Sequence, residues 1–361
     1  MELLKPEIKD ALKNPMVKRI LPRYVKVVND KSPANFQIAK RIVFNLEDKL
    51  TEKHLWQEHE KLMKKFYETK QVMDKKKLKI DDLEIPRFSL IDLKILLTKE
   101  IMKSCELCEH KCNVNRLEGE LGFCKVGNGC KISSEFIHTG EEIFYCPSHT
   151  IFFWSCNMNC IFCQNFTISN RLEPGIPVTP EFLARCIEQR RKEGCRNCNL
   201  VGGEVTMSLL WILESLKHCK VSTPILWNSN VFMSEKTMKI LDGIIDVYLT
   251  DFKYGPGECS KHLTKVKNYW DVITRNHLLA SNQTEMTIRH LILPNHVECC
   301  SKPVLDWIVE NIRKKCIVNL MGQYRPEFKA REHIDINRSI NWQETREVVD
   351  YARKLKINYI T

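Results

Sequence analysis

The feature that most constrains the fold is an alternation of short apolar runs with amphipathic stretches, which extends from about residue 149 to residue 355. The short runs predict strands and the longer stretches predict helices. Such an alternation predicts an α/β domain in which right-handed crossovers wind a parallel sheet. The expected strands cover residues 150–154, 198–201, 224–227, 244–251, 285–293 and 316–321, and the expected helices cover 179–192, 206–219, 234–241, 259–281, 302–314 and 341–355. Loops at the carboxyl ends of these strands are where chemistry is expected.

Length and composition leave room for a sizeable core. A chain of 361 residues with 43% hydrophobic residues suits one large α/β domain with an appendage, or two modest domains. No run of 18 apolar residues occurs, so the sequence predicts no transmembrane helix and no membrane partner. The first residues are too charged for the apolar part of a secretory signal. We therefore expect a cytoplasmic protein.

Residues 1–103 predict a basic and mostly helical N-terminal extension. The first 100 residues hold 23 Lys and Arg against 16 Asp and Glu. This excess of seven positive charges is most of the net charge of +11. Ser89 and Asp92 form a capping-box pattern that predicts a helix running to about Lys103. No pattern of aromatic residues and arginines accompanies the positive charge, so a solvated helical surface is favoured over nucleic-acid binding.

Seventeen cysteines are too many and too scattered for a small domain held by disulfides. In a reducing compartment, clustered thiols more often bind a metal. One cluster lies in a Cys- and Gly-rich segment, residues 104–146, and consists of Cys105, Cys108, Cys112 and Cys124. Four thiolates over twenty residues suit zinc or an iron–sulfur cluster, and unligated structural thiols are the alternative. Cys146, His149 and His138 are close enough in sequence to be other ligands.

A second cluster follows the first expected strand of the sheet. Cys156, Cys160 and Cys163 have the spacing C-x3-C-x2-C in the loop directly after that strand. Three thiolates this close can face one metal centre and leave one iron of a four-iron cluster open for another ligand. The alternatives are a structural zinc site and three unrelated buried thiols.

The stretch CNMNCIFC, with Phe162 before its third cysteine, resembles the cluster-binding motif of the radical S-adenosylmethionine superfamily. This resemblance implies that Cys156, Cys160 and Cys163 hold a [4Fe-4S] cluster. It also implies that the open iron binds the amino and carboxylate groups of S-adenosylmethionine. One electron then cleaves the sulfonium to methionine and a 5′-deoxyadenosyl radical, which abstracts hydrogen. The implied partners include an electron donor such as ferredoxin or flavodoxin.

Two further segments resemble cosubstrate-binding motifs of that superfamily. Gly202-Gly203-Glu204 resembles the GGE motif, whose carboxylate receives the methionine amino group, and an ordinary strand-to-helix turn is the alternative. Asp251 and Lys253 resemble the D-x-K segment of pyruvate formate-lyase activating enzymes, and a surface salt bridge is the alternative.

Other stretches resemble a divergent branch related to those activating enzymes. They are FCQN, HTGEE, RHLILP and LMGQY. After Tyr324 the activating enzymes usually carry a histidine, whereas this chain has Arg325, which departs from the glycyl-radical activase pattern.

Residues 147–361 are therefore expected to form a partial (β/α)6 barrel of the radical S-adenosylmethionine type. The leading function is hydrogen abstraction from a protein or peptide, as in activating enzymes. The same chemistry on a small molecule or RNA, and a non-enzymatic iron–sulfur or zinc protein, are the alternatives.

Overall fold

A computed structural model of the chain describes residues 6–46 and 51–361. Its strands form one sheet in the order β3-β1-β2-β4-β5-β6-β7-β8-β9. The strands are β1 (Cys130–His138), β2 (Ser148–Phe153), β3 (Ile176–Val178), β4 (Asn197–Gly202), β5 (Ile225–Ser229), β6 (Val247–Asp251), β7 (Glu285–Leu291), β8 (Cys316–Met321) and β9 (Tyr359–Ile360). Neighbouring strands from β2 to β9 pair in parallel, which confirms the parallel α/β sheet.

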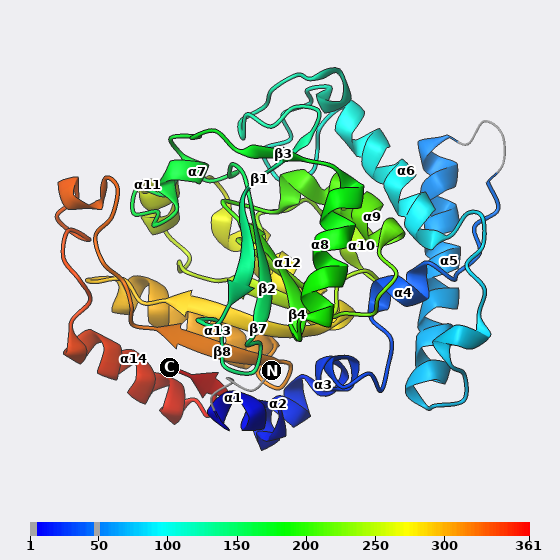
Figure 1. The fold of residues 1–361 in the computed structure, drawn as a ribbon. Coiled ribbons are helices and arrows are strands. Elements are labelled where there is room, and N and C mark those ends of the chain that lie inside the picture. Colours follow the sequence, from blue (N-terminus) through cyan, green and yellow to red (C-terminus); the bar gives the residue numbers. More distant parts are fainter. Residues whose placement is uncertain (1–5, 47–50) are drawn as a thin grey trace.

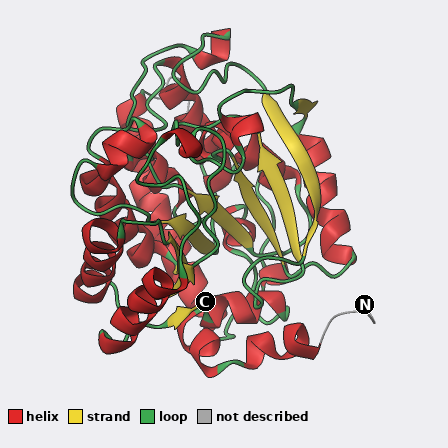
Figure 2. Ribbon diagram, turned by 90° about the vertical axis from the view of Figure 1, so that its left-hand side faces the viewer, coloured by secondary structure: helices red, strands yellow, loops and turns green. Residues whose placement is uncertain are grey.

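Helices cover the outer side of this sheet, which curls into the partial barrel that the sequence predicts (Figures 1 and 2). Apolar residues on both faces are buried, such as Leu200 and Ile288 on one face and Leu226 and Ile317 on the other, which explains why the strands read as continuous apolar runs. The helices of this region are α7 (Phe166–Ser169), α8 (Pro180–Lys192), α9 (Leu209–His218), α10 (Glu235–Leu241), α11 (Cys259–Thr264), α12 (Tyr269–Gln283), α13 (Lys302–Asn311) and α14 (Trp342–Lys354).

The one long helix expected at 259–281 is two helices. Lys265 ends α11 with φ 62°, and Asn268 precedes α12 with φ 55°. Both residues adopt the left-handed conformation that stops a right-handed helix. Apolar periodicity continues across the break, so the pattern alone does not reveal it.

The edge of the sheet differs from the expectation for residues 104–146. That segment contains β1, which pairs antiparallel with both β2 and β3. A register shift between Ile132 and Ser134 interrupts the β1–β2 pairing. The residues of β1 are buried without strict alternation, and this hides the strand from a periodicity argument.

The N-terminal region is helical, as expected. Prolines open its short helices rather than interrupting longer ones, because a proline at the first helical position lacks only an N–H that would be unpaired there. Helix α5 buries a stripe of apolar residues, and Ser89 and Asp92 form the expected capping box of α6. The helices are α1 (Pro6–Asp10), α2 (Pro15–Ile20), α3 (Pro22–Val28), α4 (Asn35–Ala39), α5 (Glu52–Asp74) and α6 (Leu90–Lys103).

Helices α2 and α3 close the amino-terminal end of the barrel (Figure 1). Their apolar side chains form a buried cluster with residues of β5, β6 and β8, including Leu226, Leu249 and Ile317. The Tyr24 hydroxyl donates to the Phe144 carbonyl (3.1 Å). Within the described residues, no helix is both long and apolar enough to cross a bilayer.

Candidate active site

A cavity of about 980 Å³ occupies the inside of the barrel. Its walls include every side chain that the sequence singled out for the [4Fe-4S] cluster and for the cosubstrate: Cys156, Cys160, Phe162, Cys163, Gly202, Gly203, Glu204, Asp251 and Lys253. These residues come from the carboxyl ends of β4 and β6 and from the loops after β2, β4 and β6. The expectation about where the chemistry lies therefore fits the arrangement of the fold.

The loop with the three cysteines is held by its backbone. The Asn159 N–H donates to the Thr264 carbonyl (3.2 Å) and the Ile161 N–H donates to the Leu263 carbonyl (2.9 Å), so the end of α11 supports the loop. Burial raises the pKa of the Cys156 thiol well above its usual value. Burial, and secondly Cys163, raise the pKa of Cys160 to about 12.

Gly202 and Gly203 are required by the crossing of two chain segments. A Cβ atom on Gly202 would lie 2.2 Å from the Phe153 carbonyl oxygen, and one on Gly203 would lie 2.1 Å from the Ser155 carbonyl oxygen. Any side chain there would displace the loop that carries Cys156. The glycines thus bring Glu204 and the cysteine loop together, which is a structural role in addition to the expected approach to a ligand.

The Glu204 carboxylate is 1% exposed and accepts four hydrogen bonds. Oε1 accepts from the Thr206 hydroxyl (2.5 Å), the Thr206 N–H (3.1 Å) and the Ser229 hydroxyl (2.7 Å). Oε2 accepts only from the Asn230 N–H (2.8 Å), which leaves it room for a further donor. Burial raises the pKa of Glu204, and these hydrogen bonds oppose the rise.

Asp251 and Lys253 form an ion pair in the cavity wall, with Nζ 2.7 Å from Oδ2. Burial opposes the charge on Lys253, but Asp251 and then Cys160 raise its pKa. The two interpretations of this motif, a cosubstrate-binding segment and a salt bridge, therefore do not exclude each other. The salt bridge faces the cavity and lies near the cysteines.

Aromatic rings line the wall behind the cysteine loop. Phe162 is 4% exposed and its ring contacts Tyr254 and Tyr324 edge to face, with centroids 6.4 and 5.7 Å apart. The Tyr324 hydroxyl donates to the Ile336 carbonyl (2.7 Å). Arg325 instead lies at the surface in an ion pair with Glu327 (3.0 Å), so it does not replace the histidine of the activating enzymes inside the cavity.

Sequence reasoning missed a charged network in the wall of the cavity. Arg289, at the end of β7, donates to Glu142 through Nε (2.8 Å) and Nη2 (2.7 Å), and it also contacts Glu141. The Asn319 amide donates to Glu142 (2.8 Å). Both glutamates belong to the HTGEE stretch and Arg289 belongs to RHLILP, so the signal was present as two separate motifs. Only the closure of the barrel shows that they form one group.

Three of the four upstream cysteines, Cys105, Cys112 and Cys124, lie around Arg116. Its Nε donates to Cys105 Sγ (2.8 Å), and the Phe123 N–H donates to Cys112 Sγ (3.4 Å). Burial raises the pKa of Cys108 to about 12, and the other three thiols, Cys124 first, add to the rise. The structure thus brings Cys105, Cys108, Cys112 and Cys124 together, and their binding of a metal stays a prediction.

The other residues considered as ligands lie elsewhere. Cys146 Sγ donates to the Glu141 carbonyl (3.4 Å), and His138 lies 3.0 Å from the Glu141 carboxylate. His149 Nε2 lies 2.8 Å from Glu135. These contacts with glutamates do not place the three residues at the upstream cysteines.

Comparison with known proteins gives two kinds of match. The sequence profile described as Radical SAM superfamily matches residues 150–308. Uncharacterized protein MJ0674 of Methanocaldococcus jannaschii is 43% identical over 346 residues, which cover 94% of this chain and 99% of that protein.

Solved structures resemble the chain more weakly. SuiB of Streptococcus suis bound to S-adenosylmethionine is 16% identical, with a TM-score of 0.40 over 57% of this chain and 47% of that one. Native anSMEcpe with bound AdoMet is 17% identical, with a TM-score of 0.41 over 55% and 56%. QueE from Escherichia coli is 12% identical, with a TM-score of 0.37 over 64% and 92%. The chain thus spans about half the length of the SuiB structure that it matches.

Proposed function

Residues 150–308 of this chain belong to the radical S-adenosylmethionine superfamily, and from that premise we propose that the protein is an enzyme that abstracts hydrogen from a protein or peptide. In this proposal, Cys156, Cys160 and Cys163 hold a [4Fe-4S] cluster. The observation that carries the proposal is that the three cysteines, Glu204, and the Asp251–Lys253 pair line one cavity at the carboxyl ends of the strands.

The residues present fit this cluster and cosubstrate. Three thiols on one loop reach the cavity, and each is partly exposed to it. The Tyr254 hydroxyl is buried without a hydrogen-bond partner of good geometry and lies beside the Cys160 thiol, whose pKa it lowers against the effect of burial. A buried polar atom of this kind is expected to find a partner when the site is filled.

When bound together, the cluster and S-adenosylmethionine supply a 5′-deoxyadenosyl radical by one-electron cleavage of the sulfonium. The protein binds and orients them and keeps water away. Glu204 Oε2 has a free acceptor position for the methionine ammonium, and the Thr206, Ser229 and Asn230 donors hold the carboxylate in place. Lys253, oriented by Asp251, offers a positive charge to the methionine carboxylate.

Charge and size support a protein or peptide substrate over RNA. An excess of negative charge in the cavity disfavours binding of a phosphate backbone. The charged side chains of the cavity are four carboxylates and two cations: Glu141, Glu142, Glu204, Asp251, Lys253 and Arg289. A cavity of about 980 Å³ must also hold the cosubstrate, so the remaining space suits a side chain or short peptide. The segments that resemble activating enzymes end β6, β7 and β8 and line this space, which supports an activating-enzyme-like role. The reducing electron would come from a ferredoxin or flavodoxin.

The test is anaerobic turnover of the full chain with a chemical reductant. We expect 5′-deoxyadenosine, and we expect its yield to rise with a responsive peptide or protein from among candidate partners. Small-molecule extracts and RNA are tested in parallel. A rise only with small molecules or only with RNA would overturn the substrate class. Absence of cosubstrate cleavage in protein with a full iron content would overturn the function itself.

We also propose that the upstream cysteines hold zinc or a second iron–sulfur cluster. Their segment packs against the loop that carries Cys156, Cys160 and Cys163, which we call the radical loop. His110 contacts the Asn157 carbonyl (2.7 Å), and the Ser155 hydroxyl donates to the Cys124 carbonyl. A segment organised by metal should resist proteolysis only while the metal is bound. Equal cleavage of residues 104–130 with and without a chelator, in protein of known metal content, would make these cysteines plain structural thiols.

A further inference from the structure

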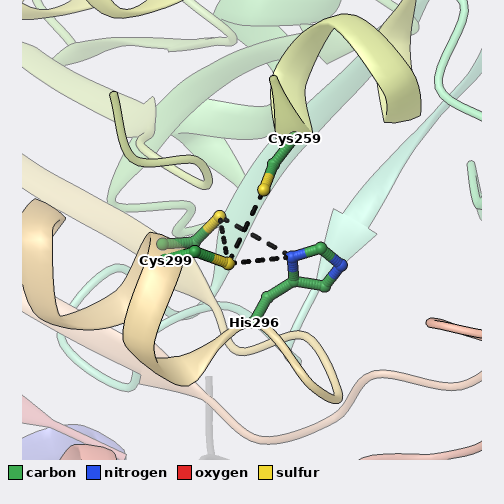
Figure 3. A group of neighbouring side chains, drawn as sticks. Cys259, His296 and Cys299 are labelled. Carbon is green, nitrogen blue, oxygen red and sulfur yellow. Dashed lines mark hydrogen bonds between the residues drawn. The ribbon is translucent and has the colours of Figure 1, made fainter. Parts of the chain in front are cut away.

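A separate group of cysteine and histidine side chains lies outside the cavity, where the segments after β6 and β7 meet. Cys259 begins α11, and His296, Cys299 and Cys300 lie in and just before the single π-helical turn Val297–Ser301 (η5). None of these four residues lines the cavity. Figure 3 shows the side chains of Cys259, His296 and Cys299 pointing toward one another from the two segments.

The distances within this group match those around a single tetrahedral ion. One ligand atom from each residue lies within 4.8 Å of all the others. Cys299 Sγ lies 3.6 Å from Cys259 Sγ and 3.9 Å from Cys300 Sγ. His296 Nδ1 lies 3.3 Å from Cys299 Sγ and 3.9 Å from Cys300 Sγ. Tetrahedral zinc with ordinary bond lengths places two sulfurs about 3.8 Å apart and a nitrogen about 3.5 Å from a sulfur.

A carboxylate orients the histidine. His296 Nε2 lies 3.3 Å from Asp335 Oδ2, so this nitrogen carries the proton and Nδ1 faces the thiols with its lone pair. Histidines that bind zinc usually donate their other ring N–H to a carboxylate or carbonyl. The arrangement therefore includes an outer partner as well as the four ligands.

The backbone brings the two segments close enough for the ligands to meet. A Cβ atom on Gly255 would lie 2.1 Å from the Cys299 carbonyl oxygen, so only glycine allows this approach. The π-helical turn lets the consecutive residues Cys299 and Cys300 aim their sulfurs at one point. Cys300 is 1% exposed and His296 is 7% exposed, whereas Cys299 is exposed and gives an ion a path of entry.

We propose that Cys259, His296, Cys299 and Cys300 form a structural zinc site. Three thiolates and one imidazole are ligands that select zinc, and four protein ligands leave no open position for catalysis. The ligand atoms converge on one point, which leaves no room for the four irons of a cluster. The zinc fixes the start of α11, and the end of α11 supports the radical loop through Leu263 and Thr264. This proposal does not depend on the proposed function.

The test is the metal content of the full chain, purified anaerobically from zinc-supplied cells. The double variant Cys259→Ser/Cys300→Ser should contain one equivalent of zinc less than the wild type and the same iron. Zinc bound at the upstream cysteines is present in both proteins, so it does not contribute to the difference in zinc content between them. Cys186→Ser, which removes a half-buried thiol on α8, is the matched control. Equal zinc in the wild type and the double variant would overturn the proposal.

Two further measurements keep the proposal testable if the double variant folds poorly. Asp335→Asn should weaken zinc binding about tenfold to a hundredfold in competition with a chelator, at unchanged stoichiometry. His333→Gln is its control, because His262 and His333 also lie within 4.8 Å of Asp335, and it should retain full affinity. Loss of the zinc in His333→Gln would assign the ion to that neighbouring group. Peptide mapping that finds a Cys259–Cys299 disulfide in the anaerobic protein would also overturn the site.

Discussion

The radical loop and the Cys259 group place thiols in opposite ways. Cys156, Cys160 and Cys163 come from one loop, face a large cavity and are not among the groups of described residues whose ligand atoms lie within 4.8 Å of one another. Cys259, His296, Cys299 and Cys300 come from two segments and converge on one point outside the cavity. Three spaced thiols beside open space suit a centre that must bind a further ligand, and four converging ligands suit an ion that only holds structure. The geometry of cysteines therefore says more about their role than their number does.

The largest effect is expected from the loop. Replacing Cys156, Cys160 and Cys163 together by Ala removes the proposed protein ligands of the cluster, so cosubstrate cleavage should fall to background. Zinc held by the Cys259 group should remain at the wild-type level. Electron paramagnetic resonance of the reduced, reconstituted protein checks the first outcome, and metal analysis checks the second. A signal that still responds to S-adenosylmethionine in the triple variant would break the distinction between the two regions.

The next effect concerns Glu204, which lies beside the cysteine loop. Glu204→Gln keeps the shape of the side chain but removes its charge, and a hydrogen bond to a charged group is worth about 1.5–3 kcal/mol. We expect S-adenosylmethionine to bind about tenfold to a hundredfold more weakly, with an intact cluster. The competing role of Glu204 is to fix the turn at Thr206. Wild-type affinity combined with a lower melting temperature would support that role alone.

A smaller effect tests the connection between the two regions. In the Cys259→Ser/Cys300→Ser variant the ligands of the radical loop are untouched, but α11 loses its anchor. Cosubstrate cleavage should therefore fall by about tenfold, which corresponds to about 1.4 kcal/mol in the barrier. The measurement is the rate of 5′-deoxyadenosine formation per bound cluster, compared with Cys186→Ser. An unchanged rate in the double variant that has lost this zinc would mean that the radical loop does not depend on the anchoring of α11.

The smallest effect comes from a buried carboxylate outside both sulfur regions. Burial raises the pKa of Glu285 to about 7, although the Tyr24 and Arg23 N–H groups and the charges of Arg23 and Lys70 oppose the rise. Between about pH 4.5 and 7 the folded protein keeps this proton and the unfolded chain has released it. Stability should therefore fall as the pH rises through this window, by at most about 1.4 kcal/mol per pH unit.

Glu285→Gln removes that titration and keeps one of the two oxygens that accept from the Arg23 and Tyr24 N–H groups. The variant should lack this part of the pH dependence, so its melting temperature relative to wild type should rise from pH 4.5 to 7 by about 2 °C per pH unit. A constant difference between the two proteins across this range would show that Glu285 does not titrate there.

Local patterns predicted the elements of the barrel and the residues of its cavity. Strand β8 has the predicted bounds, and helix α8 matches to within one residue. The same reasoning could not find the break before Asn268, because a left-handed backbone leaves no mark in apolar periodicity. It also could not pair Arg289 with Glu141 and Glu142, which lie 148 and 147 residues away and meet only when β7 closes beside β6 and β8.

The Cys259 group was missed for a related reason. Its first ligand and the next ones are about forty residues apart, whereas familiar zinc spacings pair cysteines two to four residues apart. Their meeting depends on Gly255, whose importance is visible only as the clash that a side chain would cause. Spacing arguments thus work for ligands on one loop, as at Cys156, and fail for ligands shared between loops.

The helices at the amino-terminal end of the barrel have a consequence for the order in which the protein folds during synthesis. Tyr24 bonds to Asn197, 173 residues later, and Arg23 bonds to Glu285, 262 residues later. Arg19 bonds to Asn358, 339 residues later. Helices α2 and α3 are synthesised before the strands that bury them, and the surface that buries them is complete only once β8 has been made. Their apolar faces therefore gain their full buried surface only after β8 has been made, so this end of the barrel is completed late.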